Sequence, residues 1–224
     1  MNEQLYKYKY SIILIFTVIL VIVAGSLFFI NRNESENMPA NIGNGIEESS
    51  SNSDIDFEIL PPEEPTTPAP QIHRPIVFPA GTPDNIKAQL QEDFNRVVKT
   101  LEEDHLEIAA WNELGSLRKG IEDYMGAVEA WEYALLLSPE NMVIALNLAG
   151  VHGYFLRDFA EAEKYYYKAI EYNSGSLQAY GQAYEFFSGV LKDREKATGV
   201  IDLGIKNNPD NSDLKEFRNQ ITGE

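Results

Sequence analysis

The side chains that most often bind metals or act as nucleophiles are few in this sequence and far apart. The chain contains no cysteine, and its three histidines are His73, His105 and His152. A thiolate metal site, a catalytic cysteine and a disulfide are therefore excluded. The wide separation of the histidines argues against a histidine metal cluster. We expect no metal and no cofactor.

Two other short patterns have residue types that can do chemistry. The acidic pairs at positions 102–103 and 122–123 could in principle act as a general acid and base. They fall near expected helix ends and turns, with no pocket to support them, so we interpret them as solvated charge. The run GVHG at 150–153 is too short for a phosphate-binding loop, and glycines that relieve crowding inside a helix explain it more simply. We predict that the protein is not an enzyme.

The charge balance limits the partners. The chain has 224 residues, with 18 basic and 35 acidic side chains and a net charge of −17. Binding to nucleic acid or anionic lipid requires clustered Lys and Arg, so neither is expected as the main partner. A hydrophobic content of 44% is enough for a folded domain.

An apolar segment near the N-terminus predicts a membrane anchor. Residues 11–30 read SIILIFTVILVIVAGSLFFI and carry no charge, and a helix of 20 residues spans about 30 Å. Lys7 and Lys9 precede it, which places residues 1–10 as a cytoplasmic tail and the rest outside a plasma membrane. The alternative is a signal peptide cleaved near Ala24. The apolar run continues to Ile30, longer than the core of such a peptide, and favours an uncleaved single-pass anchor.

Residues 31–82 have the composition of a disordered, acidic, proline-rich linker. They carry nine acidic and two basic side chains, and eight of the eleven prolines lie between Pro61 and Pro83. Such a segment buries too little apolar surface to offset the entropy of ordering. Two apolar pieces, DIDFEIL and PIVFP, interrupt it. We interpret them as incidental hydrophobicity, with a motif that docks on the folded domain or on a partner as the alternative.

The rest of the chain repeats with a period of 34–35 residues, in units 108–141, 142–176 and 177–211. Large residues seven apart share a helix face, and small residues between them let a second helix approach. Each unit therefore predicts two antiparallel helices that need neighbours. We expect a helix at 84–103 opened by Thr82 and Pro83, and a capping helix at 212–221 opened by Ser212. The pattern residues are Trp111, Leu114, Gly115, Tyr124, Ala127, Trp131, Ala134 and Pro139, then Leu148, Ala149, Phe159, Ala162, Tyr166 and Ala169, then Tyr180, Ala183, Ala197, Ile201, Gly204 and Pro209.

This pattern resembles the tetratricopeptide repeat (TPR) family, whose units read W-x2-L-G, then aromatic-x2-A-x3-aromatic-x2-A, then P. The resemblance covers residues 84–224. It departs from the family at Arg118 and Arg194, where an aromatic is usual. It implies an all-α solenoid of about three helical hairpins with flanking helices, forming a domain at 83–224.

The resemblance also implies that the first helix of each unit lines a concave groove. The family's chaperone-binding members hold Lys, Asn, Asn, Lys and Arg there, which clamp a peptide carboxylate; only Asn147 matches, and no cation remains. A row of amides suits hydrogen bonds to a peptide backbone, whereas the alternative is an ordinary polar surface on a spacer. The predicted groove residues are Asn112, Ser116, Asn147, Gln178 and Gln182, with Leu146 and Tyr154 as candidate apolar contacts.

These observations predict a non-catalytic, membrane-anchored protein that binds or scaffolds protein partners at the cell envelope. One alternative is an accessory subunit of a membrane enzyme or assembly complex, in secretion, pilus, cytochrome or cell-wall formation. Another is a cytosol-facing import or chaperone receptor, which the missing cationic clamp disfavours. The predicted partner is a protein or peptide, not a nucleic acid or a metal.

Overall fold

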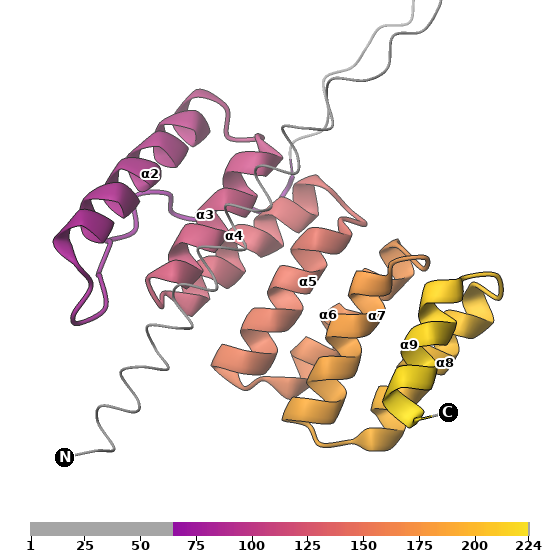
Figure 1. The fold of residues 1–224 in the computed structure, drawn as a ribbon. Coiled ribbons are helices and arrows are strands. Elements are labelled where there is room, and N and C mark those ends of the chain that lie inside the picture. The colour runs from indigo at the N-terminus through magenta and orange to yellow at the C-terminus, as the bar shows by residue number, and fades with distance from the viewer. Residues whose placement is uncertain (1–64, 224) are drawn as a thin grey trace, which may run out of the picture. The chain divides into compact units, whose positions relative to one another are not determined.

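The computed structural model describes residues 65–223, and all regular elements in this range are helices (Figure 1). No helix in this range is long and apolar enough to cross a membrane. The predicted anchor at 11–30 and the linker residues 31–64 lie outside the described part. The elements are α2 (Asp84–Glu103), α3 (Ile108–Gly120), α4 (Tyr124–Leu137), α5 (Met142–Gly150), the π-helical turn η1 (Val151–Leu156), α6 (Phe159–Tyr172), α7 (Leu177–Glu185), the π-helical turn η2 (Phe186–Val190), α8 (Arg194–Asn207) and α9 (Ser212–Thr222).

The helices form a stack in which each packs mainly on its neighbours in sequence. Helices α3 and α4 lie within 108–141, α5 and α6 within 142–176, and α7 and α8 within 177–211. At the two ends, α2 packs on α3 and α9 packs on α8. The apolar face of each hairpin is therefore covered by the next element along the chain, as expected for a solenoid.

Short polar side chains start most of these helices, and two of our expected caps are wrong. From α3 to α9, a side-chain oxygen of the residue before the helix accepts a backbone N–H, which satisfies at least one donor of the first turn. The last helix is capped by Asn211, which accepts from Asp213 and Leu214, and not by Ser212. No side chain caps α2, because its N-cap residue is Pro83; the Thr82 hydroxyl instead donates to the Pro79 carbonyl at 2.7 Å. The capping residues of α3 to α8 are Glu107, Asp123, Asn141, Asp158, Ser176 and Asp193.

The extra residue in the second and third units falls at the π-helical turns. Both η1 and η2 continue a first helix and precede the loop to the second. A π turn holds one more residue per turn than an α turn, so it absorbs an insertion without ending the helix. Packing is tight there, since a Cβ on Gly153 would lie 2.7 Å from the Phe186 ring.

The core is built from large side chains set against small ones. Trp111 and Trp131 are fully buried. A Cβ added to Gly115 would lie 2.5 Å from Nε1 of Trp131, and one added to Gly204 would lie 3.1 Å from the Tyr180 ring. These glycines therefore occupy pattern positions where an aromatic ring from the paired helix needs the space.

Two glycine substitutions should change stability in opposite directions. Gly115→Ala forces the Trp131 ring to move and should destabilise the domain by about 1–3 kcal/mol. The matched control is Gly181→Ala in α7, where an added Cβ meets open space; it should stabilise by up to about 1 kcal/mol, because alanine favours helix. Urea denaturation followed by circular dichroism measures both. Equal effects at the two positions would contradict the packing described for Gly115.

The segment before α2 is folded onto the domain, which corrects the expected linker boundary at residue 82. Residues 65–79, which we call the strap, are extended and cross α3 and α4 before the chain turns into α2 (Figure 1). Ile72, Ile76 and Phe78 are partly buried against the core. The motif PIVFP therefore docks on the folded domain, the alternative that we had set aside. Burial of these side chains, together with hydrogen bonds from Arg118, offsets the entropy that composition alone predicts to dominate.

Candidate functional site

An amide pair links the first two units on the predicted groove. Asn147 Nδ2 on α5 donates to Asn112 Oδ1 on α3 at 3.1 Å. The main-chain carbonyl of Asn112 also accepts from Trp131 Nε1 and from the Ser116 hydroxyl, each at 3.1 Å. One bond between two amides leaves the Asn112 amino group and the Asn147 carbonyl able to bond elsewhere. Three of the predicted residues thus form one hydrogen-bonded group.

The other predicted groove residues have different environments. Gln178 is exposed and Gln182 is half-buried, both on α7. Tyr154 is 46% exposed and meets the edge of Phe186, with ring centroids 6.3 Å apart. Desolvation, and next the nearby Glu185 carboxylate, raise the pKa of its hydroxyl, so Tyr154 stays a neutral donor and acceptor.

Leu146 does not fit the predicted role of an apolar contact. It is 5% exposed and belongs to the hydrophobic core. The helical pattern had placed it beside Asn147 on the outer face, but its side chain packs inward. The groove is therefore more polar than we expected.

Two glycines lie on the same helix faces as these amides. Gly150 follows Asn147 by three residues and Gly181 follows Gln178 by three, a spacing that places each pair on one side of its helix. A Cβ at either glycine would meet nothing within 4 Å. Unlike at Gly115, no neighbouring side chain among residues 65–223 requires a glycine at these two positions. Both glycines leave room for another backbone to approach.

Sequence analysis missed the role of Arg118. Its side chain is only 2% exposed, which is rare for arginine. Nη2 donates to the Arg74 carbonyl at 2.6 Å and Nη1 to the Pro75 carbonyl at 3.0 Å, both in the strap. The guanidinium also lies 5.0 Å above the Phe94 ring of α2. Two features of the sequence could have indicated this contact: the departure from the repeat pattern at position 118 and the apolar piece PIVFP upstream.

The buried guanidinium of Arg118 depends on the strap for its hydrogen-bond acceptors. Burial lowers the pKa of the Arg118 guanidinium, the Asp123 carboxylate opposes this change, and the Arg74 charge adds to it. Asp123 is 3.5 Å away, a weak contact. Arginine stays charged in proteins, so its donors need acceptors, and the strap carbonyls supply the two shortest contacts.

Two ion pairs of Arg74 and a polar contact of His73 hold the strap to the helices on either side of α3. Arg74 contacts Asp123 at 3.2 Å and Glu129 of α4 at 2.8 Å. His73 lies 3.1 Å from Glu102 near the end of α2. Exposed pairs of this kind contribute little individually, and their effect here is to fix the direction of the strap.

His152 is the buried polar side chain that the groove and the strap do not use. It is 8% exposed, and it stacks on Tyr165 with ring centroids 5.7 Å apart. Neither ring nitrogen has a hydrogen-bond partner among residues 65–223. Within that range, no group of three or more His, Asp or Glu side chains could hold a metal ion.

Comparison with solved structures shows distant structural similarity. No protein-family model matches the chain, and no curated protein matches it in sequence. A solved structure titled "First TPR of Spaghetti (RPAP3) bound to HSP90 peptide SRMEEVD" is similar at 20% identity, covering 52% of this chain and 91% of that chain, with a TM-score of 0.40. The pairing of the helices is seen in the contacts within this chain and does not depend on that similarity.

Proposed function

We propose that this protein is a membrane-anchored, TPR-like module that binds a protein partner through the face formed by α3, α5 and α7. The observation that carries this proposal is the Asn112–Asn147 amide pair, which joins adjacent units while leaving a donor and an acceptor available. An extended peptide offers alternating N–H and C=O groups that such amides bind well. The open space over Gly150 and Gly181 would let that backbone come close.

The negative charge of the domain favours a partner whose bound segment is neutral or basic. From Asp84 onward the chain carries 14 basic and 25 acidic side chains, a net of −11. A negative field repels acidic segments and speeds the encounter with basic ones. The proposed binding residues themselves are uncharged, so affinity should fall only modestly as salt rises.

Cross-linking from one groove position can capture the partner. The chain has no cysteine, so Gln182→Cys gives a single attachment site for a photo-reactive group. Illumination in native membranes should capture the partner from this position. The matched control, Glu195→Cys, places the group on the exposed surface of α8 and should not.

Loss of the amides should weaken binding and leave the domain folded, with Asn147→Ala also removing the hydrogen bond to the Asn112 side chain. Asn147→Ala combined with Gln182→Ala should reduce affinity for the captured partner by about 1–3 kcal/mol, because its backbone groups would lose their hydrogen bonds. The control is Gln89→Ala with Gln91→Ala, which removes two exposed amides of α2. Titration measures affinity, and circular dichroism checks folding. If the two double variants bind the partner with equal affinity, the binding surface lies elsewhere than on this face.

The proposed membrane topology has its own test. Residues 11–30, with Lys7 and Lys9 before them, predict an anchor whose C-terminal side faces outward. Protease added to intact cells, or to spheroplasts where an outer membrane is present, should therefore remove the helical domain. Protection of the domain in sealed cells would contradict this orientation. Absence of residues 1–25 from the mature protein would contradict the anchor.

A further inference from the structure

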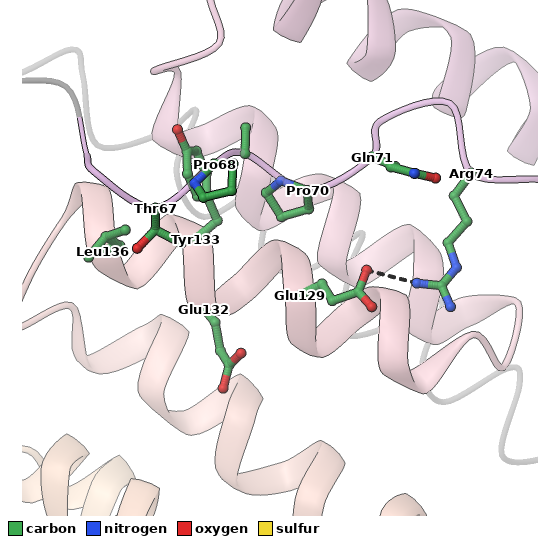
Figure 2. A pocket seen from close by; sticks show the side chains of 10 residues that line it. Thr67, Pro68, Pro70, Gln71, Arg74, Glu129, Glu132, Tyr133 and Leu136 are labelled. Atoms are coloured by element: carbon green, nitrogen blue, oxygen red, sulfur yellow. Dashed lines mark hydrogen bonds and ion pairs between the residues drawn. The ribbon is translucent and has the colours of Figure 1, made fainter.

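A hollow of about 670 Å³ lies between the strap and α4, on the second helix of the first unit. It is therefore separate from the face formed by α3, α5 and α7. A volume of this size is typical of sites that hold a few side chains. Figure 2 shows the strap running alongside α4, with Pro68 and Pro70 near Tyr133.

The apolar part of the hollow is exposed. Leu136 is 44% exposed, one of the large apolar side chains that the domain leaves in water. Pro68 and Pro70 form the facing wall, and Tyr133, which is 5% exposed, lies beneath. An apolar side chain of a partner could cover this surface and remove it from water.

The charged part of the hollow has an excess of carboxylates. Its cation, Arg74, is already paired with Glu129 at 2.8 Å and with Asp123 at 3.2 Å. Glu132 points away from the strap in Figure 2 and lies at the edge of the hollow. It accepts a hydrogen bond from the Tyr165 hydroxyl at 3.2 Å and forms no ion pair with any residue in 65–223. Glu132 is thus a fixed carboxylate with capacity for a cation.

We propose that this hollow is a second docking surface, which takes an extended segment of another protein with an apolar residue next to an arginine or lysine. The apolar residue lies on Leu136 and the strap prolines, and the cation pairs with Glu132. The chain's own preceding segment does not fit, because residues 31–64 hold nine acidic side chains and one basic one, Arg32. A second copy of this acidic chain is disfavoured by the same charge argument.

Peptide probes test the proposal on the full-length chain in dodecylmaltoside micelles. A nitroxide is attached through Thr67→Cys, at the wall of the hollow. The probes are acetyl-Leu-Arg-Leu-amide and the same peptide with neutral citrulline in place of arginine. Paramagnetic broadening of the peptide proton lines should be about two- to five-fold greater for the arginine peptide, the factor expected from an ion pair at an exposed edge.

Two variants assign the effect to named residues. Glu132→Gln keeps an acceptor for Tyr165 but removes the charge, and should abolish the preference for the arginine peptide. Glu195→Gln, a matched loss of one exposed carboxylate on α8, should leave the preference unchanged. Leu136→Ser should reduce the broadening of both peptides.

Other results would overturn the proposal. Equal broadening of the two peptides, or an arginine preference that survives Glu132→Gln, would exclude the pairing with Glu132. Equal or stronger broadening from a nitroxide on Gln182→Cys would place the arginine peptide on the α3, α5 and α7 face instead. That last outcome would support the proposed function while rejecting this second surface, so the two proposals fail separately.

Discussion

Residues 83–224 without the strap should be less stable than residues 65–224 by about 1.5–3 kcal/mol, the usual contribution of hydrogen bonds to a charged group. The cause is Arg118, which is 2% exposed and would lose the carbonyls of Arg74 and Pro75. The loss of Ile72, Ile76 and Phe78 would add to this by exposing the core. The repeat pattern alone predicts a domain at 83–224, and the strap adds residues 65–79 to the packed part of the chain.

A substitution of Arg118 separates these causes, because its effect on stability should differ in size between the two chains. In residues 65–224, Arg118→Met removes the donors for two strap carbonyls and should destabilise. In residues 83–224 the strap no longer covers the guanidinium, so water can solvate its donors and the same substitution should change stability much less. Urea denaturation of the four proteins, followed by circular dichroism, gives the comparison. An equal loss of stability in both chains would show that Arg118 does not depend on the strap.

Trp111→Ala should lower the free energy of unfolding by about 3–5 kcal/mol, as large-to-small changes at fully buried aromatic residues do. Trp111 is fully buried, and its Nε1 donates to the His105 carbonyl at 2.8 Å. Its ring meets the edge of Tyr133 with centroids 4.8 Å apart. The substitution removes all three features and leaves a cavity between α3 and α4.

Trp111→Phe is the matched control, because it keeps an aromatic ring against Tyr133 and removes only the indole donor and part of the volume. It should cost clearly less than the alanine variant. Far-UV circular dichroism is the suitable probe, since Trp131 would be the sole tryptophan left to report by fluorescence. A change under about 1 kcal/mol for Trp111→Ala would mean that the repeat register is wrong at this position.

The helices were predictable because their determinants lie close together in sequence. The spacing of Trp111, Leu114 and Gly115 within one helix specifies the face that α3 buries, and Asp158 and Asp193 mark helix starts through local capping. The place of the extra residue in the second and third units could be read from the repeat period. Its form as a π-helical turn could not, because that depends on packing around residues such as Gly153.

The strap and parts of the predicted groove depend on contacts that sequence spacing does not contain. Arg118 reaches carbonyls 43 and 44 residues upstream, and no local rule links a proline-rich segment to a cation at that distance. For the groove, the pattern placed Asn112 and Asn147 one repeat apart, and they meet at 3.1 Å. The same pattern failed for Leu146, because successive residues point about 100° apart around a helix, and Leu146 turns into the core beside Asn147.

The strap also determines how the domain would respond to mechanical load. If the chain is pulled from its N-terminal side, the force reaches the Arg74 ion pairs and the Arg118 hydrogen bonds before it reaches the first turn of α2. These contacts spread over α3 and α4, so the load is shared between two helices and does not peel α2 from the end of the stack. A solenoid normally unravels from its terminal helix, and here the terminal helix is shielded from tension by a segment that is not helical.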